Sequence, residues 1–407
     1  MNRIAIAFLM IAVTVFAAWA AGDAEDAAAQ GVTEDSVLVG NSAATSGGLA
    51  AVGVPFNQAI EAYFTMVNEA GGVAGRTIEW EHYDDEFDGA QGLTYAQRLV
   101  EDDEIFAFVG HFGTPTVAAT IDYLNTVGIP RVYYATGLRA LFDLDAEGGA
   151  RASFPVQPIY DAEGEVMVAR AVGNFDAEKV GVIYPNADDG KGLLAGIERR
   201  AEMVGVEVVA AQVSPDSNDM SSAAQTMVGE DVDAVLVAAN QVPAEVAIKA
   251  LAAAGSSVPV ITSYVNAAPS FVEGVKEALD SFDVYANAWL QVVDEEGNET
   301  PGLTEFAEEV SKIDPALAGN PYAQAGWIAA AVFVQGLERV GDEPLTWENY
   351  IAAMEEEPVN IPLGGTVDFS DGRRVGTQAM SLLKATYEEE PSWAIDQPLE
   401  PINEILD

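Results

Sequence analysis

The chain has 407 residues, and its 65 Asp and Glu against 18 Lys and Arg give a formal net charge of −47. Such a field repels phosphates, so nucleic acids and anionic membrane surfaces make poor partners. The chain contains no cysteine, which excludes disulfides, thiolate metal sites and a lipidated N-terminal cysteine. Its length exceeds what one ordinary core holds, so two domains are expected.

The N-terminal segment has the composition of an export signal. Arg3 supplies a positive charge, residues 4–20 are almost wholly apolar, and Ala18-Trp19-Ala20 offers a cleavage site before acidic residues. This pattern predicts a cleaved secretory signal peptide over residues 1–20 rather than a membrane anchor. No later apolar run reaches membrane-spanning length. We therefore expect an exported chain with no direct membrane insertion, periplasmic in a bacterium with two membranes and secreted in other cells.

Strand-like and helix-like patterns alternate from Val37 to Thr136. After a first strand, the predicted helices and strands take turns at Ala59–Asn68, Thr77–His82, Ala90–Val100, Ile105–Val109, Thr116–Asn125, Pro130–Tyr134 and Leu138–Leu141. Strands that alternate with helices of this length are typical of a parallel sheet with right-handed crossovers and helices on both faces.

The same order of elements returns further along the chain without close identity. The predicted helices and strands are Leu193–Val204, Val206–Gln212, Ser221–Val228, Asp233–Val237, Ala244–Ala254 and Val258–Thr262. The sequence therefore predicts an α/β fold with two doubly wound parallel-sheet lobes.

The last third of the chain is mainly helical. Its predicted elements are the helices Thr304–Lys312, Tyr322–Val340 and Trp347–Glu355 and the strands Gly365–Phe369 and Gln378–Thr386. We expect these helices to return to the first lobe, so that several crossings form a multi-strand hinge. The crossings are expected near residues 152–156, 284–289 and 364–375. Lobe 1 then comprises residues 36–152 and 289–364, and lobe 2 comprises residues 153–288 and 365–407.

Two strands of the first half stop at residues suited to binding an anion. Thr114 follows the strand that ends at Val109, with Pro115 directly after it, and Thr136 follows the strand that ends at Tyr134. A hydroxyl residue is favoured where a helix begins, and Pro is favoured at the first helical position. Free N–H groups and positive helix ends would then face the carboxyl edge of the sheet, where open α/β folds bind ligands.

Five short motifs occur in register along the chain. They are Gly71-Gly72-Val73-Ala74-Gly75-Arg76, Tyr83-Asp84-Asp85, Phe108-Val109-Gly110-His111, Tyr134-Ala135-Thr136, and Phe154-Pro155 followed by Ala162-Glu163-Gly164. Together they resemble the type I periplasmic solute-binding proteins of the leucine/isoleucine/valine branch, which feed ABC importers. The resemblance covers essentially the whole mature chain and is weakest beyond Asn266. It implies hinge closure on a small ligand, a membrane ABC permease as partner, no cofactor and no enzymatic activity.

The resemblance also implies which residues hold the ligand. In that family the loops matching Gly113-Thr114 and Tyr134-Ala135-Thr136 hold an amino acid's α-carboxylate, and further side chains cover the ligand. The candidate ligand-binding residues are Phe112, Gly113, Thr114, Tyr134, Ala135, Thr136, Tyr160, Gln241 and Tyr264, with Val52, Asp189 and Val265 as additional candidates.

The chain departs from the family where the α-ammonium is usually bound. The family has an acid near Tyr264-Val265, whereas residues 261–266 contain none. A buried ammonium without a carboxylate is costly. Either Asp188 or Asp189 replaces that acid, or the ligand is an amide or an aromatic or aliphatic acid that lacks the charge. The tyrosines at 134, 160 and 264 suit broad apolar walls with polar tips, or ordinary packing at the lobe edges.

The chain offers little support for metal or catalytic chemistry. His82 and His111 have no metal-ligand spacing, and we place them on the second strand and in a cleft loop. The acidic run at 84–88 lacks the glycine and ligand spacing of a calcium loop, so we expect no metal site. Thr114 is predicted as a helix cap rather than a nucleophile, and no hydrolase motif is present. A secreted α/β enzyme or a sensor subunit acting on a small metabolite are the rival functions.

Overall fold

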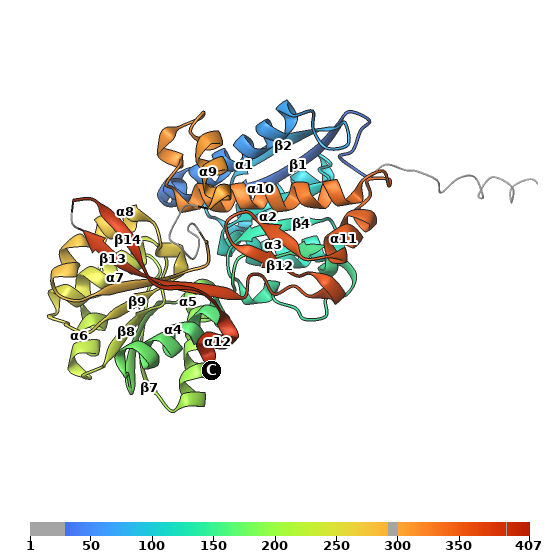
Figure 1. Ribbon diagram of the computed structural model, residues 1–407. Helices are drawn as coiled ribbons and strands as arrows, with labels where there is room; N and C mark the ends of the chain where they lie inside the picture. The colour runs from blue at the N-terminus through green and yellow to red at the C-terminus, as the bar shows by residue number, and fades with distance from the viewer. Residues whose placement is uncertain (1–28, 292–299, 388) are drawn as a thin grey trace, which may run out of the picture.

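The protein is built from two α/β halves, each around its own sheet (Figure 1). The computed structural model describes residues 29–291, 300–387 and 389–407, so the predicted signal peptide lies outside the described residues. The fold is of the α/β class with two doubly wound sheets, as the alternating pattern predicts.

The first sheet has five strands in the order β2-β1-β3-β4-β5, and every neighbouring pair is parallel. The strands are β1 (Ser36–Ala43), β2 (Thr77–Asp84), β3 (Ala107–Phe112), β4 (Arg131–Ala135) and β5 (Ser153–Phe154). β3 is buried along its whole length because helices cover both faces of a parallel sheet.

Helices from distant parts of the chain cover this sheet. One face carries α1 (Ala50–Glu69), α10 (Pro321–Val340) and α11 (Trp347–Glu356), and the other carries α2 (Gly89–Glu101) and α3 (Thr114–Val127). The same half includes α9 (Pro301–Val310) and the antiparallel pair β11 (Val359–Ile361) and β12 (Gly365–Val367). The last third of the chain therefore packs on the sheet that the first third forms.

The second sheet has seven strands in the order β14-β13-β10-β9-β8-β6-β7. They are β6 (Lys179–Pro185), β7 (Glu207–Val213), β8 (Ala234–Val237), β9 (Val260–Thr262), β10 (Val284–Ala288), β13 (Ala379–Tyr387) and β14 (Pro391–Pro401). β6 to β10 pair in parallel, whereas β13 and β14 add an antiparallel edge. The helices are α4 (Tyr160–Phe175), α5 (Asp188–Val204) and α12 (Ile402–Leu406) on one face, and α6 (Ser221–Gly229), α7 (Val242–Ala253) and α8 (Pro269–Val275) on the other.

Short 3-10 turns link several of these elements. They are η1 (Gly47–Leu49), η2 (Arg139–Leu141), η3 (Gly148–Ala152), η4 (Tyr264–Asn266), η5 (Lys276–Asp280), η6 (Pro315–Leu317) and η7 (Ser370–Gly372).

Within the described residues, the chain passes between the sheets after β5, after β10 and between β12 and β13. The first and last passages lie side by side, because the N–H of Thr377 donates to the carbonyl of Val156 at 2.6 Å and its hydroxyl donates to the same oxygen at 2.7 Å. β5 pairs with β4, so the first sheet reaches Phe154, slightly past the boundary expected at residue 152.

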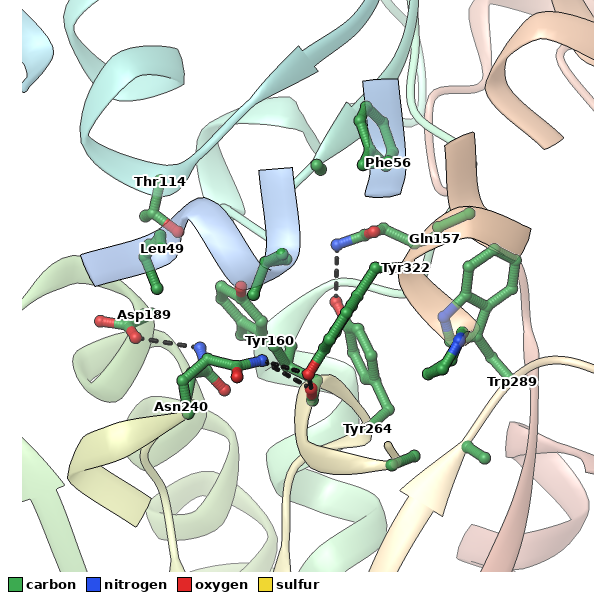
Figure 2. A pocket seen from close by; sticks show the side chains of 18 of the residues that line it. Leu49, Phe56, Thr114, Gln157, Tyr160, Asp189, Asn240, Tyr264, Trp289 and Tyr322 are labelled. Carbon is green, nitrogen blue, oxygen red and sulfur yellow. Dashed lines mark hydrogen bonds between the residues drawn. The ribbon is translucent and has the colours of Figure 1, made fainter. Parts of the chain in front are cut away.

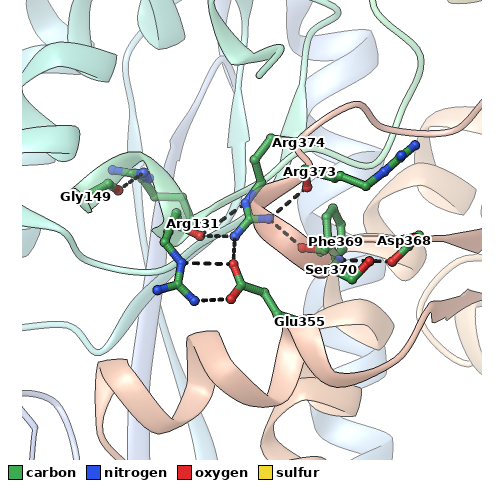
Figure 3. A network of polar contacts seen from close by, with 9 residues as sticks. Arg131, Gly149, Glu355, Asp368, Phe369, Ser370, Arg373 and Arg374 are labelled. Carbon is green, nitrogen blue, oxygen red and sulfur yellow. Dashed lines mark hydrogen bonds and ion pairs between the residues drawn. The ribbon is translucent and has the colours of Figure 1, made fainter. Parts of the chain in front are cut away.

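A buried ion cluster fixes the last passage to the first half (Figure 3). Arg374 is 1 % exposed, and its guanidinium pairs with Glu355 of α11 at 2.5 Å and donates to the carbonyl of Phe369 at 2.9 Å. Arg151 of η3 pairs with the same carboxylate. The ring of Phe154 lies 4.7 Å from the Arg374 guanidinium. Since a buried charge must be paired, this cluster specifies where the passage docks.

The structure corrects several expected elements. α1 begins at Ala50 rather than Ala59, and its first turns contain Gly53, where a Cβ would meet the Ala44 carbonyl at 2.0 Å. The helix expected at 138–141 is only the 3-10 turn η2, because the chain turns extended at Phe142. His111 lies on β3 and is fully buried, so its placement in a cleft loop was wrong.

Candidate functional site

A large cavity lies between the carboxyl edges of the two sheets (Figure 2). Its volume is about 1420 Å³, which exceeds the roughly 300–1,000 Å³ usual for small-molecule sites. Loops of both sheets, the first turns of α1, the N-terminal end of α10 and residues of the strands β13 and β14 line it.

The cavity sits where strand order reverses in each sheet. β1 connects to β2 on one side and β3 connects to β4 on the other, and the loops that leave them carry Leu49 and Thr114. In the second sheet β6 leads to β7 and β8 leads to β9, and their loops carry Asp189 and Gln241. Such switch points leave a crevice in which open α/β sheets bind ligands. Here residues from two such crevices line one cavity.

The start of α3 brings two hydroxyls together. Gly113 precedes the helix with φ 93°, a region that disfavours side chains, and a Cβ there would lie 2.9 Å from the Phe87 ring. Thr114 is the first helical residue, and its Oγ1 lies 2.9 Å from Oγ1 of Thr136. Neither threonine caps a helix with its side chain, so the predicted cap role is wrong. The two buried hydroxyls instead form a pair beside the helix N-terminus.

Tyr160, the first residue of α4, lies next to this pair. Burial, together with the nearby carboxylate of Asp189, raises the pKa of Tyr160 to about 12, although its contacts with the hydroxyls of Thr114 and Thr136 act in the opposite direction. The phenol therefore stays neutral at physiological pH and can donate a hydrogen bond into the cavity. Its ring stacks on Tyr264 with the centroids 6.1 Å apart.

A kink in the first sheet decides which tyrosine faces the cavity. Gly110 and Tyr133 both have left-handed φ, 68° and 60°, so the side-chain alternation of β4 is interrupted. Tyr133 lines the cavity. Tyr134, which was expected there, packs against Val117 and places its hydroxyl 3.0 Å from Oγ of Ser153.

Hydrogen bonds between uncharged side chains connect the residues of the far wall of the cavity. The hydroxyl of Tyr133 donates to Oε1 of Gln157 at 3.0 Å, and Nε2 of Gln157 donates to the hydroxyl of Tyr264 at 2.9 Å. Trp289 extends this wall, with its ring 6.5 Å from that of Tyr133. Burial raises the pKa of Tyr264 well above its ordinary value. The wall is therefore aromatic with uncharged polar tips.

A buried carboxylate supports Tyr264 from behind. Glu163 of α4 is fully buried, and its oxygens accept hydrogen bonds from the backbone N–H of Tyr264 at 2.7 Å and from Oγ of Ser263 at 3.0 Å. Nδ2 of Asn287 donates to it at 3.3 Å. Burial raises the pKa of Glu163 to about 8, although these hydrogen bonds act against the shift. Glu163 fixes the loop that positions Tyr264.

The two halves touch across the rim through Gln241. This residue adopts φ 57°, and Oδ1 of Asn266 accepts its N–H at 2.6 Å. Its Nε2 donates to the carbonyl of Val265 at 3.0 Å and to the hydroxyl of Tyr322 at 2.7 Å. Because Tyr322 lies in the first turn of α10 in the first half, this contact spans the cavity.

Asp189 supplies an acid on the wall formed by the second sheet. It lies in the first turn of α5, and Nδ2 of Asn240 donates to its Oδ2 at 2.9 Å. Burial raises its pKa, against hydrogen bonds from the N–H of Gly190 and from Asn240. Thus an acid does reach the cavity, although residues 261–266 carry none.

The expected site residues divide into two groups. Those that line the cavity are Val52, Phe112, Gly113, Thr114, Ala135, Tyr160, Asp189, Gln241, Tyr264 and Val265. Tyr134 points elsewhere, and Thr136 does not line the cavity but contacts two residues that do, Thr114 and Tyr160.

Sequence reasoning missed several lining residues, which include Leu49, Phe56, Tyr133, Gln157, Asn240, Trp289 and Tyr322. Asn240 follows a predicted strand next to Gln241, so its position was a usable signal. Trp289 directly follows β10, within the crossing expected near residues 284–289, but was not identified as a site residue. Tyr322 follows no strand and has no local signal.

Other kinds of site receive no support in the described part of the chain. Residues 29–291, 300–387 and 389–407 contain no group of three or more His, Asp or Glu placed to hold a metal ion. None of the helices in those ranges combines the length and apolar character that a membrane crossing requires.

Two doubly wound lobes with a cavity at their facing switch points define a bilobal binding protein. The chain belongs to the family described as periplasmic binding protein, which matches residues 36–389. The resemblance carried by the five motifs is therefore confirmed.

The chain spans about half the length of the curated relatives that it matches. The Leu/Ile/Val-binding protein homolog 3 of Brucella melitensis is 27% identical over 195 residues, which cover 46% of this chain and 50% of the relative. The amino acid binding protein of Pseudomonas aeruginosa is 26% identical over 178 residues, 42% of this chain and 45% of the relative.

Solved structures share the fold across nearly the whole chain. A fatty acid ABC transporter substrate-binding protein from Thermomonospora curvata has a TM-score of 0.80 at 22% identity and covers 93% of this chain and 95% of its own. A branched chain amino acid ABC transporter from Thermus thermophilus with bound valine also scores 0.80, at 16% identity, covering 91% and 97%. At such identities the likeness establishes the fold.

Proposed function

We propose that the chain is the extracytoplasmic solute-binding component of an ABC importer. The observation that carries the proposal is the cavity, in which the helix start at Thr114 and the wall at Asp189 belong to different sheets. The ligand is a small carboxylate-bearing molecule, an amino acid or a related amide, aromatic acid or aliphatic acid. This range is supported by the amino acid binding protein among the relatives and by the fatty acid ABC transporter substrate-binding protein among the similar structures.

The ligand acts by closing the two lobes, residues 36–152 with 289–364 and residues 153–288 with 365–407. It binds first at Gly113 and Thr114, and the second lobe then rotates about the passages. A shift from mostly open to mostly closed needs about 5.5 kcal/mol of differential binding. A charge-assisted carboxylate contact of roughly 1.5–3 kcal/mol and burial of an apolar side chain at roughly 1.5–3 kcal/mol together approach this value.

Export and partnership complete the proposal. The segment at residues 1–20 is a cleaved signal peptide, the mature protein works in the periplasm, and the closed form docks on a membrane ABC permease. The site holds no cofactor or metal and performs no catalysis. The neutral tyrosines that line the cavity are suited to holding a ligand rather than to transferring its protons.

A thermal-shift screen over amino acids, amides, aromatic acids and aliphatic acids tests the proposal. A native-state ligand at 100 times its Kd stabilises by about 2.7 kcal/mol, so hits are recognised without a label. Each hit is then titrated by calorimetry, and small-angle scattering measures closure. Binding with a reduced radius of gyration and no product in mass spectrometry is the expected result. Turnover of a hit would instead identify a secreted enzyme, and no hit at all would contradict solute binding.

The identity of the membrane partner distinguishes an import function from a sensing function. The ligand-loaded protein is expected to stimulate ATP hydrolysis by its reconstituted permease, whereas the unloaded protein stimulates it weakly. A ligand-dependent complex with a membrane receptor and no effect on any permease would identify a sensor subunit.

A further inference from the structure

The cavity extends beyond the switch points of the two sheets. It continues over β10, β13 and β14, at the end of the second sheet away from β6 and β7. The β13–β14 pair lies four strand positions from the switch point between β6 and β8, or roughly 19 Å at about 4.8 Å per strand. An amino acid is shorter than this distance, so one held at the switch points would not reach β13 and β14.

We call this part of the cavity the lateral arm. Its apolar lining residues are Trp289, Leu290, Leu383, Trp393, Ile395 and Leu399. Among the described residues that line the lateral arm, none is charged, whereas Asp189 and Asp216 line the cavity at the other end of the second sheet. Figure 2 shows Asp189 and Trp289 at opposite ends of the cavity. The cavity therefore has a polar end between the lobes and an apolar end at the edge of the second sheet.

The two sides of β14 differ in character. Successive side chains of a strand point to opposite sides, and Ile395, which is the register partner of Leu383, lines the lateral arm. Burial lowers the pKa of Arg170 on α4, and the negative charges of Asp396 and Glu400 oppose this shift. These two acids of β14 therefore lie toward α4, and the apolar residues of the strand are left for the cavity.

The short helix α8 forms one wall of the lateral arm and leaves its floor accessible. Nε1 of Trp393 donates to the carbonyl of Ala268 at 3.1 Å, and its ring stacks on Phe271 with the centroids 6.4 Å apart. These contacts fix Trp393, whereas Ile395 on the same strand is 48 % exposed. An exposed apolar surface that is continuous with a binding cavity is suited to an apolar part of the ligand.

We infer that the lateral arm is a second subsite, which holds the apolar chain or ring system of a ligand longer than an amino acid. The inference rests on the proposed solute-binding function and adds to it the shape of the ligand. The polar head lies between the lobes, and the tail passes Trp289 and lies on β13 and β14. Each methylene that enters the lateral arm raises affinity roughly 3–4-fold, which corresponds to about 0.8 kcal/mol.

Two series of unbranched compounds test the inference by calorimetry. One series is butanoate, hexanoate, octanoate and decanoate, and the other is butanamide, hexanamide and octanamide. The two head groups separate the effect of the tail from that of the head. In both series affinity is expected to rise roughly 10-fold with each pair of added methylenes. Affinity that stops rising at the second member of each series would overturn the inference.

The variant Ile395→Asp places a charge in the lateral arm. It is expected to bind decanoate and octanamide at least 10-fold more weakly than the wild type and to bind the shortest member of each series equally well. The loss in the amide series excludes simple repulsion between charges. Met203→Asp is the matched control, because Met203 is an exposed apolar residue of α5 that does not line the cavity. Leu383→Trp, which fills the lateral arm, is the independent variant if Ile395→Asp does not fold.

The fluorescence of Trp393 gives a readout that does not depend on affinity. The bromine of 10-bromodecanoate quenches a tryptophan that it contacts. At equal occupancy, this compound is expected to quench the wild type more than Trp393→Phe, and 4-bromobutanoate is expected to quench the two proteins equally. Equal quenching of both proteins by the long compound would place the tail elsewhere and overturn the inference.

The outcomes separate this inference from the proposed function. An unchanged dependence on chain length in both Ile395→Asp and Leu383→Trp, or binding of amino acids but of no longer compound, would overturn the second subsite and leave solute binding intact. A dimer that is lost in Ile395→Asp while ligand affinity stays constant would show that this surface binds a second copy, which overturns it as well. If no acid, amide or amino acid binds the wild type, the proposed function fails together with the inference.

Discussion

Nε2 of Gln241 lies 2.7 Å from the hydroxyl of Tyr322, and this hydrogen bond joins the two halves of the protein across the cavity. The same hydroxyl donates to the carbonyl of Val265 at 3.2 Å. Asn266 holds Gln241 at φ 57°, a conformation that a residue other than glycine adopts only when its surroundings enforce it. Uncharged groups therefore bridge the rim of the cavity. Opening of the two halves would break these hydrogen bonds.

The variant Tyr322→Phe tests this bridge. It removes both hydrogen bonds of the hydroxyl and keeps the ring, so the free energy of unfolding should fall by about 0.5–1.5 kcal/mol. The population of the unloaded protein should also shift toward a wider arrangement, with a larger radius of gyration in small-angle scattering. Tyr184→Phe is the control, because its hydroxyl bonds Gln212 at 3.2 Å within the second sheet. A radius of gyration that is the same in both variants would contradict a bridging role.

The hydroxyl pair at the start of α3 predicts a loss of affinity in Thr114→Val and in Thr136→Val. Each change removes one hydroxyl of the contact at 2.9 Å, so affinity for carboxylate ligands should fall by about 1–3 kcal/mol. Calorimetry with a ligand found in the screen measures the loss. Thr226→Val is the control, because its hydroxyl bonds the carbonyl of Ser222 at an exposed position of α6 and does not line the cavity. Unchanged affinity in both cavity variants would refute the assignment of this end of the site.

Glu163 predicts a pH dependence of stability. Burial raises its pKa from 4.5 to about 8 in the native protein, so the native state binds this proton more tightly than the unfolded chain does. The stabilisation from this proton is complete below pH 4.5 and is lost as the pH rises to about 8. Relative to Glu163→Gln, the wild type should therefore lose stability across that window, by up to roughly 1.4 kcal/mol per pH unit.

Denaturant unfolding at several pH values measures this difference. Glu198→Gln, at an exposed position of α5, removes the same charge and should show no such window. A difference between the wild type and Glu163→Gln that is constant from pH 4.5 to 8 would show that Glu163 does not take up the proton.

The ion cluster at the last passage predicts a large loss of stability in Glu355→Gln. The change leaves the guanidinium of Arg374 buried without its carboxylate, which costs about 3–5 kcal/mol. Urea unfolding measures the loss, and Glu356→Gln, an exposed neighbour on α11, should lie within about 0.5 kcal/mol of the wild type. Equal stability of the two variants would mean that the cluster does not hold the passage in place.

Much of the fold could be predicted because its signals are local. The apolar run at β3 and the helical spacing before and after it reflect burial on both faces of a parallel sheet. Such a pattern of apolar residues is visible within a short segment of the sequence. Gly113 and Thr114 were found for the same reason, since the carboxyl end of a strand and the start of a helix are adjacent in sequence.

The choice between Tyr133 and Tyr134 shows where local signals stop. Strict alternation along β4 gives no reason to expect the left-handed conformation at Tyr133, which pairs with the kink at Gly110 and exchanges the faces of the two side chains. Thr136 was misread in a similar way, because a hydroxyl that suits a helix cap suits a partner hydroxyl equally well.

By itself, the sequence determined the alternation of strands and helices in both halves and placed Thr114 and Gln241 just beyond predicted strands, because hydrophobic period and turn chemistry act between near neighbours along the chain. The elements β10, β14 and α4 were not among those it predicted. Only the tertiary structure decided that Tyr322 meets Gln241 and that Asn240 meets Asp189. These partners are far apart in the chain and are brought together by the packing of whole helices and sheets, whose geometry no short segment encodes.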